Sequence, residues 1–245
     1  MPPDRAEQTP ISSAKPLQLL HRIRTQIDVP STAALMTVAI VVGLGTGSAA
    51  VLFIKAIDWV THLSFEQGLP QFLAPLGSAW VILIPIIGSL ISGPIIAFWA
   101  IEAKGHGVPE VMQAITTQGG RIRPRVAVVK SIASSVCIGT GGSAGREGPI
   151  VQVGAALGST AAQIMGLGTE QTITLVACGA AAGIAATFNA PIAGVIFAME
   201  VIVGEFTTHY FGTVVVSAVA ANIVSRHFLG SSPAFAVPTY ALVSA

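Results

Sequence analysis

Charged residues are scarce in this chain of 245 residues, of which 9% are charged and 52% are hydrophobic. A soluble domain carries about 25% charged residues, so the composition excludes an ordinary soluble fold. The mean hydropathy of +0.76 indicates a membrane protein, and a membrane-spanning helix needs roughly 20 mostly apolar residues. Stretches without any charge run over Ser31–Ile54, Gln67–Ile101, Ser131–Gly145, Gly148–Thr169, Gln171–Met199 and Phe211–Ser225. The sequence therefore predicts a polytopic membrane protein.

Basic residues and cysteines are also few. The net charge of +1 comes from 12 Lys and Arg residues that mostly interrupt loops, which excludes the basic face that nucleic acid requires. Cys137 and Cys178 lie inside apolar segments without Cys-x-x-Cys spacing. They are expected to be small packing residues and not a disulfide or a metal site. No cofactor is indicated.

Residues 1–30 are polar and proline-rich, and they lack the apolar core of a signal peptide. Within them, residues 17–27 alternate in a way that suits a helix lying along the membrane surface. The first spans are predicted at Ser31–Ile57 and Trp80–Ile101. Lys and Arg residues precede the first span and follow the second, so the positive-inside rule places both clusters in the cytoplasm. We expect a cytoplasmic segment over 1–30 and a cell-membrane domain over 31–245.

The apolar segments after Pro124 are shorter and interrupted. They are predicted at Val126–Ile138, Pro149–Met165, Thr172–Ala186, Pro191–Val203 and Tyr210–Phe228. Broken helices of this kind are expected where the backbone lines a polar cavity. Glycines such as Gly179 and Gly183, four residues apart, indicate close helix packing. The chain is predicted to be all-α, with broken and tilted helices.

Two loops interrupt the apolar pattern with Gly, Pro and charge, at Lys104–Glu110 and Gly145–Pro149. Proline suits the first turn of a helix, so helix N-termini are expected near Val108 and Pro149. Such an end carries about half a positive charge and unpaired N–H groups, which bind anions. The candidate anion-binding residues are Gly105, His106, Gly107, Val108, Pro109, Gly145, Arg146, Gly148 and Pro149.

Glu147 stands within the second loop, between Gly145 and Gly148. An ionisable side chain at membrane depth is costly and functional by default. Its carboxylate is expected to compete with the permeant anion at the helix N-terminus, and protonation would release it. The alternative is that Glu147 pairs with Arg146 and ties down a surface loop.

Three motifs resemble signatures of the CLC family of anion channels and transporters. Residues 105–109, Gly-His-Gly-Val-Pro, are similar to the family's G-S-G-I-P segment, and residues 145–149 resemble G-R-E-G-P letter for letter. Residues 188–194, Phe-Asn-Ala-Pro-Ile-Ala-Gly, resemble F-N-A-P-L-A-G. The three motifs keep the family's order and spacing, and the resemblance covers Ser31 to the end.

The resemblance implies an all-helical fold of two inverted halves per subunit, a homodimer, and one pathway for chloride or a similar anion in each subunit. Only the first half is expected here, because the second half's G-x-F-x-P motif is missing between Val195 and Ala245. It also implies that Glu147 is the gating glutamate. The backbone from Gly145 to Gly148 would then form part of the outer anion site.

Two positions depart from the family pattern. His106 replaces the serine whose hydroxyl donates to the central ion, so an imidazole would donate instead and add pH sensitivity, unless it turns away to a backbone carbonyl. Val201 occupies the place of the inner proton-carrying glutamate. This favours a channel or uncoupled conductor over a chloride/proton antiporter. Glu200 and Glu205 are possible substitutes, although Glu200 is as well explained as a buried carboxylate bonded to helix ends. Lys104 and Glu110 are expected at the cytoplasmic mouth.

Two rival classes remain. Residues 141–145 satisfy the hydrolase pattern G-x-S-x-G by letters, but that pattern needs a strand, a histidine and an acid. No Asp follows Asp58, and the five histidines are scattered, so an enzyme is not predicted. The second rival is a non-conducting structural membrane subunit, which a flux measurement separates from a transporter.

Overall fold

The computed structural model describes residues 32–66, 80–204 and 208–230. The chain divides into two units, residues 1–34 and 35–245, and the second unit holds every element discussed below except the start of the first helix. The predicted surface helix over residues 17–27 and the expected 1–30 segment lie outside the described residues, as does Glu205. The described residues form helices and no strands, which confirms the all-α fold class.

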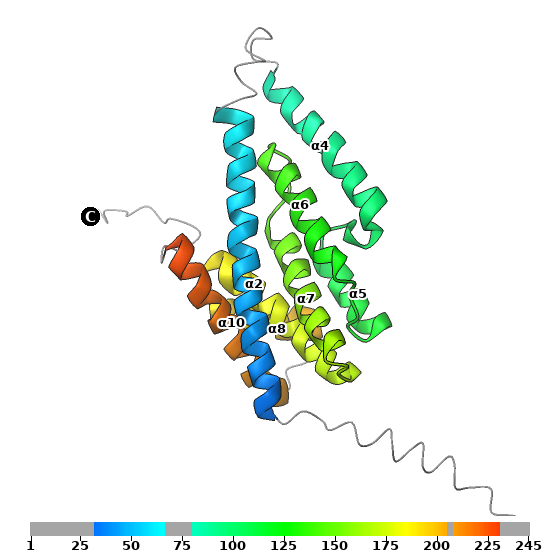
Figure 1. Cartoon of the computed structure of the whole chain (residues 1–245), viewed down its shortest axis with the longest axis vertical. Coiled ribbons are helices and arrows are strands. Elements are labelled where there is room, and N and C mark those ends of the chain that lie inside the picture. The colour runs from blue at the N-terminus through cyan, green and yellow to red at the C-terminus, as the bar shows by residue number, and fades with distance from the viewer. Residues whose placement is uncertain (1–31, 67–79, 205–207, 231–245) are drawn as a thin grey trace, which may run out of the picture. The chain divides into compact units, whose positions relative to one another are not determined.

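The helices follow one another along the chain as Figure 1 shows. The α-helices are α2 (Thr32–Thr61), α4 (Trp80–Trp99), α5 (Val108–Gln118), α6 (Arg125–Gly139), α7 (Glu147–Ile164), α8 (Thr169–Phe188), α9 (Pro191–Phe197) and α10 (Thr208–Leu229). Short elements are the π-helix η1 (His62–Glu66), the 3₁₀-helix η3 (Ile101–Ala103) and the π-helix η4 (Ala198–Val203). Among the described residues, four helical segments are long and apolar enough to cross a membrane: Thr32–Glu66, Trp80–Trp99, Thr169–Phe188 and Tyr210–Leu229.

The first two predicted spans correspond to α2 and α4. Helix α2 continues past Asp58 and Trp59, so the loop predicted directly after them is displaced and η1 follows instead. The segment predicted at Thr172–Ala186 is longer than expected, because α8 is long enough to span a membrane, whereas α10 is close to the predicted Tyr210–Phe228. Helix α8 begins at Thr169, ahead of the first apolar run, because the Gln171 side chain accepts a hydrogen bond of 2.9 Å from the Gly168 N–H and caps this polar first turn.

Helix α8 is the centre of the second unit, because α7, α9 and α10 all pack against it. Glycines allow the α7–α8 approach: a side chain at Gly154 would collide with the backbone of Gly179, and one at Gly158 with that of Leu175. Small residues therefore let these helices pack backbone to backbone, as the sequence predicted. Helix α2 contacts α10 in the same way, through Gly43 and Gly47.

The Phe-Asn-Ala-Pro segment ends one helix and begins the next. Asn189 adopts a left-handed conformation with φ of 55° and terminates α8, a position that Asn tolerates better than most residues. Pro191 then occupies the first position of α9, where its missing N–H costs nothing. The chain reverses here within a few residues, and α9 packs back onto α8.

Candidate anion site at two helix N-termini

The loop before α5 is a tight glycine turn. Gly105 and Gly107 have φ values of 111° and 100°, a region that L side chains avoid, so these two positions require glycine. Helix α5 then begins at Val108 with Pro109 in its first turn, which confirms the predicted helix start. Between the glycines, the His106 side chain is exposed. It makes no hydrogen bond within the part of the chain that the structure describes, so it does not cap a backbone carbonyl there.

The buried Lys130 side chain anchors the loop before α5. Its side chain is 4% exposed, and its Nζ donates hydrogen bonds of 2.9 Å to the Ala103 carbonyl and 2.8 Å to the Gly105 carbonyl. Lys130 is one of the basic residues that follow the second predicted span, and the structure shows it buried within α6. The available signal was its place inside an apolar segment, where an ammonium needs internal partners.

Glu110 occupies part of the α5 N-terminus. Its Oε2 accepts a hydrogen bond of 2.6 Å from the Gly107 N–H, and its charge is attracted by Lys130. The expectation that the first amides of α5 are all unpaired is therefore wrong for Gly107. A carboxylate of the chain itself already fills this anion-binding position, as a capping residue three positions into a helix does.

The loop before α7 is arranged differently. Helix α7 begins at Glu147, two residues before Pro149, so the helix N-terminus is at the predicted loop but slightly earlier. Arg146 stacks over the Phe188 ring, with its Cζ 5.8 Å from the ring centroid. The Glu147 carboxylate is exposed and folds back over Gly145.

Ion pairs within the described ranges involve His62, Glu66, Glu102, Arg123 and Arg125, and none involves Glu147. The alternative in which Glu147 pairs with Arg146 is therefore not what the structure has. A carboxylate at the first position of a helix interacts favourably with the helix N-terminus without a counter-ion. Glu147 therefore has a favourable position at the helix end and no ion-pair partner among the described residues.

The two loops meet through their backbones. A side chain at Gly107 would collide with the Gly148 carbonyl, and a side chain at Gly148 would collide with the His106 carbonyl. The N-termini of α5 and α7 are therefore adjacent, with the His106 and Glu147 side chains exposed. The predicted site residues 105–109 and 145–149, far apart in sequence, lie together in space.

Other candidate residues are not part of this junction as far as the described contacts show. Glu200 lies in η4 and is exposed, whereas Val201 beside it is half-buried. This exposure does not fit a buried carboxylate bonded to helix ends. The hydrolase-like residues 141–145 follow helix α6 instead of a strand, so they do not form the strand-to-helix turn that a serine nucleophile needs.

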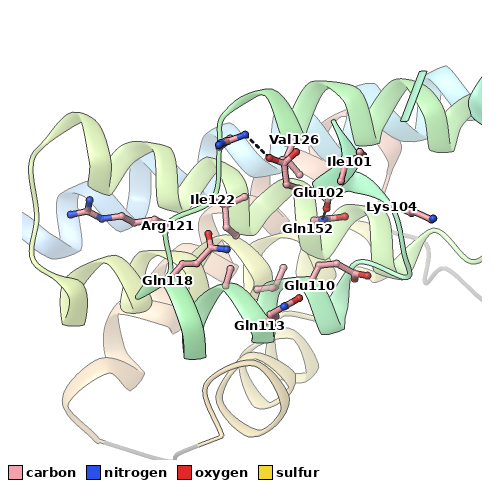
Figure 2. Close-up of a pocket in the computed structure, with 13 residues that line it drawn as sticks. Ile101, Glu102, Lys104, Glu110, Gln113, Gln118, Arg121, Ile122, Val126 and Gln152 are labelled. Atoms are coloured by element: carbon pink, nitrogen blue, oxygen red, sulfur yellow. Dashed lines mark hydrogen bonds and ion pairs between the residues drawn. The ribbon is translucent and has the colours of Figure 1, made fainter. Parts of the chain in front are cut away.

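A polar network joins the ends of three helices on one side of the junction. Glu102 Oε1 accepts hydrogen bonds from Arg123 at 2.7 Å and Arg125 at 3.1 Å. The backbone N–H of Glu102 lowers the pKa of its carboxyl, and the two arginines lower it further. Gln152 of α7 donates to the Glu102 carbonyl at 3.0 Å. Figure 2 shows Glu102 and Gln152 side by side in this network.

The described residues form an all-helical, multi-pass membrane protein in which interrupted helices bring two N-termini together. The chain belongs to the voltage gated chloride channel family, whose model matches residues 88–245.

Known proteins agree with this assignment. A ClcB-like protein of Ralstonia nicotianae is 33% identical over 217 residues, which cover 86% of this chain and 50% of that protein. An H(+)/Cl(-) exchange transporter, ClcA of Salmonella arizonae, is 33% identical over 241 residues, covering 92% of this chain and 49% of that protein. The solved structure of a slow cyanobacterial Cl⁻/H⁺ antiporter is similar with a TM-score of 0.66 and 27% identity, over 81% of this chain and 48% of the other. The chain spans about half the length of these two relatives.

Proposed function

We propose that the protein transports chloride or a similar anion across a membrane, along a path that passes the junction of α5 and α7. The observation that carries this proposal is the backbone contact between Gly107 and Gly148, which brings two helix N-termini to one place. Amide N–H groups and partial positive charges at such ends bind an anion firmly enough to replace its water, yet loosely enough to release it. Membership of a chloride channel family supports the same conclusion.

Glu147 is the gate in this proposal. Its carboxylate sits at the first position of α7 and has no ion-pair partner among the described residues. It therefore competes with the permeant anion for the backbone amides from Gly145 to Gly148. Protonation removes its charge, weakens its hold on the helix end, and opens the path. His106 adds a donor beside the path, since its imidazole is exposed next to Gly107.

The proposal includes the setting of the protein. Four helices among the described residues are able to span a membrane, which makes the protein multi-pass. We place the N-terminus and the basic residues 121–125 on the cytoplasmic side by the positive-inside rule. We further propose that the full-length protein is a homodimer in the cell membrane, as the family resemblance implies.

We further propose that the protein conducts anions without coupled proton movement. Val201 is an apolar, half-buried side chain at the place where an inner glutamate would pass protons, and valine cannot carry a proton. The second candidate is a chloride/proton antiporter. The names of the Salmonella relative and of the cyanobacterial structure favour it, because both are chloride/proton exchangers. In that case the exposed Glu200 would replace the missing acid.

Both candidates are tested by flux in liposomes reconstituted with the full-length protein. We expect chloride efflux above that of empty liposomes, and no uphill proton movement driven by a chloride gradient. Val201→Glu serves as the comparison variant, because it restores a titratable group. Uphill proton pumping by the unaltered protein would favour the antiporter, and efflux equal to that of empty liposomes would indicate the non-conducting structural subunit.

A further inference from the structure

A second polar pocket lies beside the anion site and shares none of residues 105–109 or 145–149. Its volume is about 430 Å³, which is within the usual range of small-molecule sites. Elements η3 and α5, the start of α6, and Gln152 of α7 enclose it (Figure 2). The residues that decide its chemistry are Glu102, Lys104, Glu110, Gln118, Arg121 and Gln152.

Both acidic side chains of this pocket already accept hydrogen bonds, whereas two of its basic side chains have no ion pair among the described residues. Glu102 accepts from Arg123 and Arg125, and Glu110 accepts from the Gly107 N–H. Lys104 and Arg121, by contrast, have no acidic partner within 4.0 Å among the described residues. The lining carries three basic side chains (Lys104, Arg121 and Arg123) and two acidic ones (Glu102 and Glu110), a net charge of +1 that favours an anionic ligand.

Gln152 adds an independent requirement. Its side chain is 2% exposed, and its Nε2 is committed to the Glu102 carbonyl. Its buried Oε1 has no hydrogen-bond partner among the described residues, although an unpaired buried acceptor is costly. An amide oxygen accepts only from a donor such as a hydroxyl. A bare anion such as chloride cannot satisfy it.

We propose that this pocket binds an organic phosphate that carries hydroxyl groups. Figure 2 shows Arg121 and Lys104 at opposite ends of the pocket, with Gln118 and Gln152 between them. A guanidinium binds phosphate through two parallel N–H groups, so the phosphate lies at the Arg121 end. A ligand hydroxyl donates to Gln152 Oε1. Two sources have this chemistry: the headgroup of phosphatidylglycerol, and a soluble sugar or glycerol phosphate.

The soluble source is tested by titrating the detergent-purified full-length protein with glycerol 3-phosphate and, separately, with inorganic phosphate. We expect glycerol 3-phosphate to bind at least about fivefold more tightly than inorganic phosphate, a difference of about 1 kcal/mol for one hydrogen bond. Arg121→Gln should weaken binding about tenfold, as the loss of a charge-assisted pair does. Arg226→Gln removes an equally exposed arginine of α10 outside the pocket and should leave binding unchanged.

The lipid source is tested by native mass spectrometry of the same protein from nanodiscs that contain equal amounts of phosphatidylglycerol and phosphatidylcholine. Retention of phosphatidylglycerol that is lost in Arg121→Gln and kept in Arg226→Gln would establish a headgroup site. Gln152→Met keeps the volume of this buried side chain and should weaken either ligand. If Gln152→Met fails to fold, the exposed Arg121 variant still decides the result.

The proposal is overturned if neither probe binds, if Arg121→Gln and Arg226→Gln behave alike, or if inorganic phosphate binds as tightly as glycerol 3-phosphate. Binding is measured without any flux. The binding proposal can therefore be refuted while anion transport is confirmed, and the reverse is also possible.

Discussion

The N-termini of α5 and α7 meet at one junction, yet each treats its carboxylate differently. At α5, Glu110 is tied to the Gly107 N–H, and a buried Lys130 fixes the loop through two carbonyls. At α7, Glu147 stands at the first helical position, exposed and without an ion pair in the described part of the chain. The carboxylate at α5 is hydrogen-bonded to its own loop, whereas the carboxylate at α7 has no ion-pair partner among the described residues.

The difference shows how one helix property supports two roles. Both ends offer partial positive charge to an anion. A carboxylate three residues into the helix reaches back to cap it and stays. The Glu147 carboxylate, at the first position of its helix, is exposed and lies over Gly145, and we propose that it moves aside to open the path. Changing each carboxylate in turn therefore separates the structural role proposed for Glu110 from the gating role proposed for Glu147.

The largest effect is expected from Glu147→Gln. One carboxylate that gains a proton changes the open fraction by up to about tenfold per pH unit, so chloride flux in liposomes should rise as the pH falls. Glutamine cannot titrate, and flux through the variant should be high and nearly independent of pH. Glu170→Gln, at the exposed first turn of α8, is the matched control and should behave as the unaltered protein. An unchanged pH profile of flux in Glu147→Gln would contradict the assignment of Glu147 as the gate.

Lys130→Met should lower the free energy of unfolding by about 2–4 kcal/mol, because the Ala103 and Gly105 carbonyls lose their buried donor. Thermal unfolding in detergent measures this loss of stability. Chloride flux should fall as well, because the loop before α5 is held less firmly. Lys130→Arg keeps a cationic donor and should recover part of both. Lys55→Met, at an exposed position of α2, should change little. Equal losses in the two Met variants would contradict the positioning role.

Glu110→Gln is expected to strengthen chloride binding by up to about fivefold. The amide oxygen can still accept from Gly107, but the negative charge at the helix end is gone, which is worth about 1 kcal/mol. Calorimetric titration with chloride measures the change. The pH dependence of flux should remain, in contrast to Glu147→Gln. A loss of pH dependence here would mean that the roles of the two carboxylates are reversed.

The smallest effect concerns Glu102, outside the junction. Its pKa is lowered from the ordinary value of 4.5, so its stabilising contribution is present above that value and is lost as the pH falls through the lowered pKa. Glu102→Gln should therefore melt slightly below the unaltered protein at neutral pH, and the two should converge in acid. The pairs are exposed, and salt should shrink the difference further. A difference in melting temperature that grows as the pH falls would contradict the predicted direction of the effect.

Much of this arrangement could be predicted from residue chemistry. Pro109 and Pro149 indicated helix N-termini, and Asn189 followed by Pro191 fits the break between α8 and α9. Three features were not predicted. The length of α8 depends on a cap at Gly168, the burial of Lys130 depends on where α6 packs, and the capture of Gly107 by Glu110 is a side-chain choice. The two caps join residues three apart in the sequence, and the burial of Lys130 rests on a tertiary contact; hydrophobic periodicity encodes neither kind.

The central claim is that an anion binds where the α5 and α7 N-termini meet. Anomalous diffraction from crystals of Glu147→Gln grown in bromide tests it directly, because bromide replaces chloride and its position can be seen. We predict a bromide peak within hydrogen-bonding distance of the backbone amides of Glu147 and Gly148, beside Gly107. Ordered bromide elsewhere in the protein, with none at this junction, would contradict the claim.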